Sequence, residues 1–310
     1  MATTKPDVGA LVEQMPETDR ELQSKQPPEP DKPDQPRRPR RLDSFGEASK
    51  FTGPDPKAAE KIFAEIVAGG RDSILELIGL ARDPSDADFK NYKAGYVLHG
   101  VALYVGRSEN DRQRRLFAET LASQLSSEKL SKAVKGFLIR ELQVAGGKEV
   151  AETLGRHLQD DELCEYVVQA LIAIREGAGV QLRRGLEGAT GKNRVTIIQA
   201  LGVVRDTESA GALQRALSAS DSDVRIAAAC ALGNIGDSGS VVALIKAADE
   251  AKGWEGIQNT KACLVLAERL LAAGKKADAN RIYTHLRDSR TEAGERYVRE
   301  AAEKALSGDQ

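Results

Sequence analysis

Apolar residues recur at a fixed spacing in the middle of the chain. In residues 221–237 they occupy relative positions 0, 1, 4 and 7, starting at Ala228. That spacing forms one stripe on a helix of 3.6 residues per turn. The central Ala-Leu pairs of three such stripes, at 170–171, 200–201 and 231–232, follow each other at steps of 30 and 31 residues. The stripes are Ala228, Ala229, Leu232 and Ile235; Ile197, Ile198, Leu201 and Val204; and Val167, Val168, Leu171 and Ile174.

A second predicted helix alternates with these stripes. Its anchoring residues are Leu154, Leu182, Leu213 and Leu244, which are separated by 28, 31 and 31 residues. Each unit is therefore two short helices joined by a tight turn. A unit of about 30 residues cannot bury both of its apolar faces alone, so successive units must stack.

The best-preserved unit resembles the HEAT-repeat family, in particular the short bacterial HEAT-like repeats of the phycobilin-lyase type. The resemblance rests on Asp223-Val224-Arg225, Ala231-Leu232-Gly233 and Ile235-Gly236-Asp237. It implies an all-α fold, a right-handed α-solenoid of about seven helix pairs plus a closing helix over residues 54–310, with the clearest repeats at 161–250. The motif is specific for the fold and nearly silent on function.

The last helix pair, residues 263–286, has a different character. It is similar to a single tetratricopeptide unit, with a small-residue helix, a turn at Gly274 and an aromatic residue, Tyr283. Both resemblances predict a helical hairpin here, so the predicted architecture does not depend on the choice between them.

The first 50 residues differ from the rest in composition. Eight of the eleven prolines lie in residues 1–39, and residues 26–41 are almost all proline, charged or amide residues. Such a segment cannot bury enough apolar area to offset its ordering entropy, so we predict a disordered tail over residues 1–50. Within it, residues 8–15 can form a short amphipathic turn. The basic cluster at 37–41 is either a solvating linker or an anchor for an acidic partner.

Charge and cysteine content narrow the class of protein. The net charge is −2 and the pI about 6.1, without the basic excess that nucleic-acid binding favours. The three cysteines, Cys164, Cys230 and Cys263, are widely spaced within apolar helical stretches and are expected to be small buried side chains. The sequence has neither Cys-x-x-Cys nor His-x-x-x-His spacing. We expect no metal, no cofactor and no nucleic-acid partner.

The sequence has no run of 18 apolar residues, so we expect no membrane span. The start, Met-Ala-Thr-Thr-Lys-Pro-Asp, lacks an apolar signal core. The chain as written is therefore expected to be cytoplasmic. A cell-envelope location is the alternative if a signal peptide was removed.

A column of basic residues accompanies the second helices. Each stands two residues after the anchoring leucine, about 200° around the helix, and therefore points away from the core. In a HEAT-like stack the column forms a line of positive charge that suits an acidic strip on a partner protein. The alternative is that these side chains only solvate the face. The column consists of Arg156, Arg184, Arg215 and Lys246.

A second set of charged residues is expected to stabilise the packing between units and not to bind a partner. Arg194 and Arg225 occupy equivalent places in successive first helices, and Asp206 and Asp237 occupy equivalent places in the turns. The family resemblance implies that a turn acid pairs with the arginine of the next unit, for example Asp206 with Arg225. A bidentate pair of this kind would fix the rotation between units.

Aromatic residues supply two further candidates. Trp254, the only tryptophan, lies in a predicted Gly-flanked loop and is either an exposed partner anchor or a plug where the packing changes. Tyr92, Tyr96, His99 and Leu103 fall along one helical face. They form either a ligand pocket with acid–base chemistry or partly buried packing, and packing is favoured.

Together these patterns favour a non-catalytic scaffold or adaptor that binds another protein on a solenoid face, with tentative contacts at the basic column and Trp254. One alternative is lyase-like or chaperone-like handling of a chromophore or of a cofactor-bearing partner. It requires a reactive cysteine or a His/Asp pair, which the sequence does not reveal. A HEAT-like nucleic-acid-binding protein is the other alternative. The sequence leaves the oligomeric state open.

Overall fold

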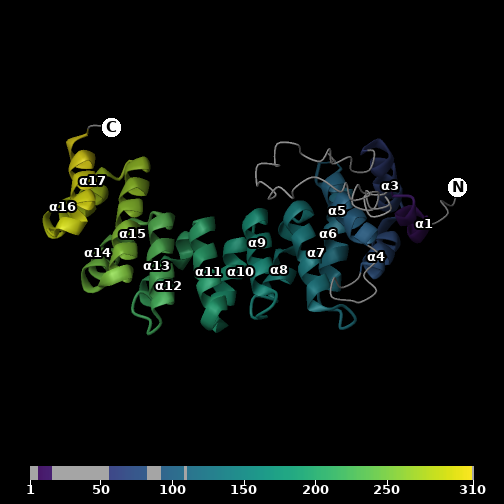
Figure 1. Cartoon of the computed structure of the whole chain (residues 1–310), viewed down its shortest axis with the longest axis horizontal. Coiled ribbons are helices and arrows are strands. Elements are labelled where there is room, and N and C mark those ends of the chain that lie inside the picture. Colours follow the sequence, from purple (N-terminus) through teal and green to yellow (C-terminus); the bar gives the residue numbers. More distant parts are fainter. Residues whose placement is uncertain (1–5, 16–55, 82–91, 108–109, 309–310) are drawn as a thin grey trace, which may run out of the picture. The chain divides into compact units, whose positions relative to one another are not determined.

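The computed structural model describes residues 6–15, 56–81, 92–107 and 110–308 (Figure 1). The described residues form helices and connecting turns and contain no strand, so the predicted all-α fold is confirmed. Most helices pack on the helix next to them in the chain or on the next but one. The chain divides into two compact units, residues 1–145 and residues 146–310.

The first unit contains six described helices. They are α1 (Val8–Glu13), α3 (Pro56–Ala68), α4 (Gly70–Leu80), α5 (Tyr92–Arg107), α6 (Asp111–Gln124) and α7 (Lys132–Ala145). Residues 82–91, before α5, lie outside the described part of the chain. The core of this unit contains large apolar residues such as Phe117, Leu121 and Leu138, all fully buried.

Helix α1 departs from the expectation of disorder over residues 1–50. Val8, Leu11 and Val12 of this helix are buried, as is Met15 just after it. The helix packs against α3, α4 and α5. It forms because the short amphipathic pattern noted at residues 8–15 finds an apolar surface within the first unit. Residues 16–55, including the basic cluster at 37–41, lie outside the described residues.

The second unit contains ten described α-helices and three short 3₁₀ turns. The first helices of the repeats are α9 (Cys164–Ile174), α11 (Gly191–Val204), α13 (Ser222–Ile235) and α15 (Gly253–Ala272). The second helices are α8 (Lys148–Gly155), α10 (Ala178–Gly188), α12 (Ala210–Ala216) and α14 (Val241–Glu250). Helices α16 (Lys276–Ser289) and α17 (Arg296–Ser307) follow, and α15 and α16 form the predicted hairpin.

Small residues set the spacing between successive first helices. A Cβ atom added at Gly202 of α11 would lie 2.7 Å from Cα of Ala231 in α13. One added at Gly233 of α13 would lie 2.8 Å from the backbone oxygen of Ala262 in α15. These two helix pairs make the most extensive contacts in the unit. Successive first helices therefore approach closely, and both glycine and alanine contribute to this contact.

The ends of α13 follow from its sequence. The side chain of Asp221 accepts a hydrogen bond from the backbone nitrogen of Asp223 at 2.8 Å, which caps the start. Gly236 closes the helix in the left-handed region, at φ 76°. The equivalent end of α11 has Arg205 at φ 55°, a conformation that an L-residue with a side chain adopts less easily. Among α9, α11 and α13, only α13 ends without a non-glycine residue at positive φ.

Candidate functional site

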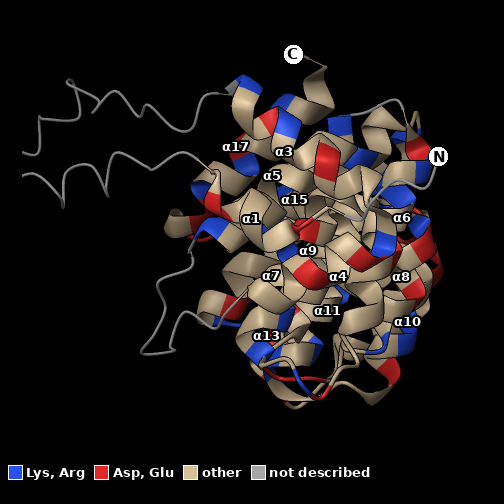
Figure 2. Ribbon diagram, turned by 90° about the vertical axis from the view of Figure 1, so that its right-hand side faces the viewer, with Lys and Arg blue, Asp and Glu red and all other residues tan. Residues whose placement is uncertain are grey.

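The outward side of the second helices in the second unit carries the predicted basic column. Arg156, Arg184, Arg215 and Lys246 are all exposed, as their position two residues after the anchoring leucine predicted. The anchoring leucines Leu154, Leu182, Leu213 and Leu244 are fully buried on the opposite side of the same helices. Figure 2 shows that basic and acidic residues are interspersed along the helices.

Two of the four basic residues have an acidic neighbour on their own helix. Arg156 Nη2 lies 3.0 Å from Glu152 Oε1, and Lys246 Nζ lies 3.7 Å from Glu250 Oε1. Arg184 and Arg215 make no ion pair with the residues that the structure describes. The charge available to a partner is therefore concentrated on α10 and α12.

Exposed valines accompany the basic residues one helical turn earlier. Val180 of α10 is 41% exposed and Val242 of α14 is 57% exposed. They precede Arg184 and Lys246 by four residues, so each pair shares one side of its helix. On α12 the equivalent position is Gly211, where an added Cβ would approach only the Arg215 guanidinium, at 3.9 Å. We call Val180, Arg184, Arg215, Val242 and Lys246 the second-helix face.

The second-helix face ends at a hollow between α14 and α16. Its volume is about 380 Å³, and Val242, Lys246 and His285 are among the residues that line it. His285 Nε2 lies 2.9 Å from Asp249 Oδ2, and Arg290 Nη2 lies 2.9 Å from Asp249 Oδ1. Asp249 is thereby held by two basic side chains, and it contributes little free negative charge beside Lys246.

The predicted pairing of Asp206 with Arg225 is wrong. Asp206 instead pairs with Arg183 of α10, whose guanidinium also contacts Glu208 at 2.9 Å. Arg225 donates two hydrogen bonds to Glu255 of α15, at 2.6 and 2.7 Å. The turn acid reaches back to the preceding second helix because its turn lies beside that helix. The start of α13, where Arg225 lies, faces the start of α15.

The two remaining members of that set do not form ion pairs with the described residues. Arg194 has a buried Nε without a hydrogen-bond partner among these residues. Asp237 accepts a hydrogen bond from the hydroxyl of Ser240 at 3.3 Å, within its own turn. At the same ends of the first helices, Lys192 contacts Glu165 at 3.0 Å. Ties between repeats therefore include two that join first helices, Lys192 with Glu165 and Arg225 with Glu255, and one that joins a second helix to the next turn, Arg183 with Asp206.

Burial and hydrogen bonding act in opposite directions on the pKa values of Arg225 and Glu255. Hydrogen bonds from Arg225 lower the pKa of the Glu255 carboxyl below its ordinary value of 4.5, and burial opposes this only partly. The hydrogen bond to Glu255 correspondingly raises the pKa of Arg225. Both groups are therefore charged at neutral pH, as a tie between two helices requires.

Trp254 lies in the first turn of α15, not in the loop that the flanking glycines predicted. Its side chain is 68% exposed, and Ile257, one turn later, is 50% exposed. Ile257 and Tyr297 share a hollow of about 630 Å³ beside the start of α15. The exposure favours the anchor interpretation of Trp254 over the plug interpretation, since a residue that fills a packing gap would be buried.

The Tyr/His set of the first unit includes a contact that the sequence did not reveal. His99 Nδ1 lies 2.9 Å from Glu141 Oε2, between α5 and α7. Glu141 is almost fully buried, and this burial raises the pKa of its carboxyl. Tyr96 is partly buried nearby on α5, and the side chain of Tyr92 lies outside the described residues. The signal available in the sequence was an acid directly before a buried leucine, Leu142, within an apolar helix.

The three thiols have the character expected of packed side chains. Burial raises the pKa of Cys164 to about 11 and that of Cys263 to about 12, and it also raises the pKa of Cys230. Since the thiolate is the nucleophile, these groups react poorly at neutral pH. Within the described residues, His, Cys, Asp and Glu side chains do not gather in a group of three able to hold a metal ion.

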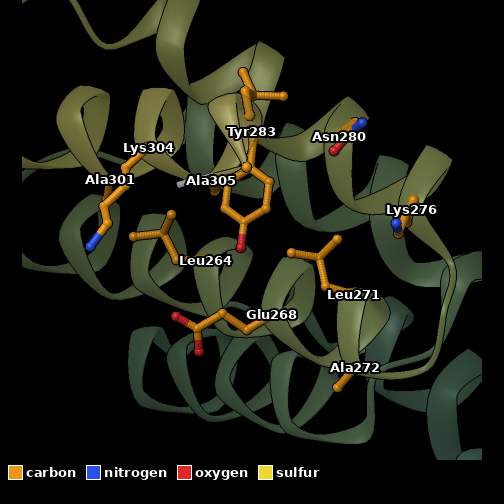
Figure 3. A pocket seen from close by; sticks show the side chains of 12 residues that line it. Leu264, Glu268, Leu271, Ala272, Lys276, Asn280, Tyr283, Ala301, Lys304 and Ala305 are labelled. Carbon is orange, nitrogen blue, oxygen red and sulfur yellow. The ribbon is translucent and has the colours of Figure 1, made fainter. Parts of the chain in front are cut away.

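A further hollow of the second unit lies between α15, α16 and α17 (Figure 3). It has a volume of about 800 Å³ and mixes apolar side chains such as Leu264 and Leu271 with Glu268 and Lys304. The ring of Tyr283 points into it. Burial, together with the nearby charge of Glu268, raises the pKa of the Tyr283 phenol. The phenol therefore stays protonated at neutral pH and is a hydrogen-bond donor here.

None of the helices in the described part of the chain combines the length and the apolar character that crossing a membrane requires.

Comparison with known proteins identifies the repeats. Residues 181–264 match the family model for HEAT repeats. Among solved structures, the complex of CpcE and CpcF of phycocyanin lyase from Nostoc sp. PCC7120 is 17% identical, with a TM-score of 0.34 over 82% of this chain and 98% of that chain. Human deoxyhypusine hydroxylase in complex with glycerol is 18% identical, with a TM-score of 0.27 over 81% of this chain and 96% of that chain. A search of curated proteins finds no match. Residues 181–264 are therefore a segment of HEAT repeats.

Proposed function

We propose that the chain is a non-catalytic protein-binding scaffold, and that its second-helix face holds an acidic, partly apolar segment of another protein. The observation that carries the proposal is the repetition of one exposed pattern on successive units. An apolar side chain and a basic one stand four residues apart on α10 and on α14, and α12 repeats the basic position. Stacked repeats present such positions as a row, which is how repeat proteins build extended binding surfaces.

Two exposed arginines of the second-helix face support an acidic partner. Arg184 and Arg215 are exposed and have no ion pair among the described residues. Arginine donates hydrogen bonds to a carboxylate in a fixed fork, so it suits carboxylate recognition. Exposed Val180 and Val242 would be covered by apolar side chains of the same partner segment. Trp254, exposed at the start of α15, offers a further anchor, because tryptophan is enriched among residues that dominate binding energy.

A binding comparison with matched variants tests the proposal. The wild-type chain and the Arg184→Glu/Arg215→Glu variant are used to capture partners from an extract of the native host. The control is Lys192→Glu/Lys261→Glu, which makes the same charge change on first helices. We expect the wild type and the control to retain the same stoichiometric partner, and the arginine variant to lose it. Retention of that partner by the arginine variant, with its helicity and melting unchanged, would exclude the second-helix face as the site.

A second pair of variants tests the apolar half of the face. Val180→Ser/Val242→Ser removes exposed methyl groups without changing charge, so we expect weaker capture of the same partner and unchanged melting. Raising the salt concentration should weaken the arginine contribution, because interactions between exposed charges are screened. Equal capture at low and high salt would contradict the acidic nature of the partner segment.

Handling of a chromophore or of a cofactor-bearing partner is less well supported. A covalent role for the chain's own cysteines conflicts with the raised pKa of all three thiols. The test is the colour of the purified protein. Visible absorbance that co-purifies with the chain in stoichiometric amount would favour this alternative over the scaffold.

A further inference from the structure

The N-terminal helix α1 occupies an apolar groove of the first unit in the manner of a bound peptide. Val8, Leu11, Val12 and Met15 stand at relative positions 0, 3, 4 and 7, which is one face of a helix. Their exposed fractions are 0%, 7%, 1% and 3%. The other face, with Ala10, Glu13 and Gln14, is exposed. This is the pattern by which short amphipathic helices bind hydrophobic grooves.

The ends of α1 are also defined by contacts. The carboxylate of Asp7 accepts a hydrogen bond from the backbone nitrogen of Ala10 at 3.0 Å and caps the helix start. Pro6 packs against Gly69, where an added Cβ would lie 2.7 Å from the proline ring. Gly69 joins α3 to α4, so the groove includes a backbone segment that only glycine leaves open. A Cβ at this position would clash with the hydroxyl of Ser73 in α4 as well as with Pro6.

The contacts of α1 are confined to one part of the first unit. It packs on α3, α4 and α5, whereas α6 and α7 pack on α4, α5 and each other. The contacts among α3 to α7 are made directly and do not run through α1. A helix of six residues is not stable alone in water, so the helical state of α1 depends on the groove. In the sequence 42 residues, 14–55, separate α1 from α3, a length that spans at most about 150 Å, so chain connectivity alone does not require α1 to lie against α3.

One polar group in the groove is not satisfied by α1. Ser73 of α4 is fully buried, and its hydroxyl has no hydrogen-bond partner among the described residues. It lies beside Gly69, beneath Pro6. A buried hydroxyl without a partner is costly. The α1 segment therefore leaves an interaction in this groove unused.

We propose that the groove formed by α3, α4 and α5 is a helix-docking site, and that α1 is its detachable, built-in occupant. A segment with the same chemistry, a short amphipathic helix with Val-x-x-Leu-Val-x-x-Met spacing and an acidic N-cap, binds the groove from another molecule once α1 is released. The inference concerns the first unit and does not rest on the proposed function of the second-helix face.

The test uses a fluorescent peptide of residues 5–16 and the full chain. In the Leu11→Asp/Val12→Asp variant the tethered helix cannot dock, so the groove is open. We expect this variant to bind the peptide at least tenfold more tightly than the wild type, whose own α1 competes. The control Ala10→Asp/Gln14→Asp adds the same charge on the exposed face of α1 and should behave as the wild type. A peptide carrying the two aspartates at positions 11 and 12 should bind neither protein.

A third substitution tests whether the peptide binds in the groove formed by α3, α4 and α5. Gly69→Val, added to the Leu11→Asp/Val12→Asp variant, should abolish peptide binding because the new side chain fills the place of Pro6. If binding survives this change, the peptide binds elsewhere and the proposal fails. It also fails if the folded Leu11→Asp/Val12→Asp variant does not bind the peptide.

Hydrogen exchange of the wild type covers the case in which the double variant does not fold. If α1 is detachable, the amides of residues 11–15 exchange much faster than those of the core of α5, through opening that leaves α5 protected. If both sets exchange at the same rate, through unfolding of the whole unit, α1 is an integral part of the core and the proposal is overturned.

Discussion

Arg225 and Glu255 join two consecutive first helices through a bidentate ion pair. Nε and Nη2 of Arg225 in α13 donate to the two oxygens of Glu255 in α15, at 2.6 and 2.7 Å. The remaining nitrogen, Nη1, donates to the backbone oxygens of Ala219 and Ser220, at 2.7 and 2.8 Å. One guanidinium therefore fixes α13, α15 and the connection before α13 relative to each other.

Arg225→Lys should lower the melting temperature of the protein. A lysine ammonium has three donors on one atom and cannot satisfy both the carboxylate fork and two carbonyl groups in this geometry. Thermal unfolding followed by circular dichroism measures the effect. The matched control is Lys192→Gln, which breaks an exposed pair with Glu165, at side-chain exposures of 78% and 66%, and should change melting little. Equal effects of the two changes would show that the Arg225 pair does not stabilise the stack.

The stability contributed by Glu255 should depend on pH. Hydrogen bonds from Arg225 hold the pKa of this carboxyl below its ordinary value of 4.5 in the folded protein. A folded-state pKa below the unfolded one stabilises the fold above the unfolded value, and the stabilisation is lost as pH falls through the folded pKa. The wild type should therefore be more stable than Glu255→Gln at pH 7, with a difference that shrinks below about pH 4.5.

Urea unfolding of both proteins between pH 7 and pH 3 measures this difference. Glu176→Gln is the control, because the Glu176 pair with Lys148 is exposed, at side-chain fractions of 69% and 58%. We expect the control to differ little from the wild type at every pH. A gap between wild type and Glu255→Gln that stays constant down to pH 3 would contradict the lowered pKa.

Gly202→Ala should destabilise the protein by about 1–3 kcal/mol, the usual cost of forcing extra volume into a packed contact. The new methyl group would lie 2.7 Å from Cα of Ala231, and a backbone atom can move away only if α11 and α13 separate. Denaturant unfolding measures the change. Gly294→Ala is the control, since an added Cβ there meets no atom within 4 Å. If Gly202→Ala is as stable as the wild type, the helix spacing is not set by this glycine.

The native thiols should react slowly with alkylating reagents at pH 8. A thiol with a pKa of about 11, such as Cys164, has a thiolate fraction about two orders of magnitude below that of a free cysteine. Burial limits access further. Ser218→Cys, at an exposed position, supplies a fast-reacting reference within the same fold. Mass spectrometry should show one rapid modification in this variant and all three native modifications only after denaturation. Rapid modification of the folded wild type would contradict the packing of these residues.

Local patterns in the sequence predicted most of the helical architecture of the second unit. The stripe at residues 221–235 predicted α13 within one residue, because Asp221, Gly236 and the apolar spacing all indicate the same helix. The direction of Arg184 and Arg215 followed from their distance to a buried leucine on the same helix. Such inferences need only the geometry of one helix, which the sequence determines closely.

Relationships between helices were harder to predict. The partner of Arg225 depends on how far α15 extends toward its N-terminus, and Gly253 and Gly256 obscured that start. The contact between His99 and Glu141 joins residues 42 positions apart, in a unit whose repeat pattern is degenerate. The docking of α1 was hidden by the composition around it, since a single amphipathic turn is a weak signal beside a proline-rich segment. In each case the missing information was the position of a second element.

The close approach at Gly202 and Gly233 has a mechanical consequence. The first helices α11, α13 and α15 are in contact along their backbones, so this side of the second unit resists both compression and extension. The second helices α10, α12 and α14 make only sparse contact with each other within the described structure. Small bends of the second unit therefore change the distances between Arg184, Arg215 and Lys246. The spacing of the first helices at Gly202 and Gly233 stays nearly constant during such a bend. A partner that contacts all three residues at once would hold these distances fixed and make the second unit harder to bend.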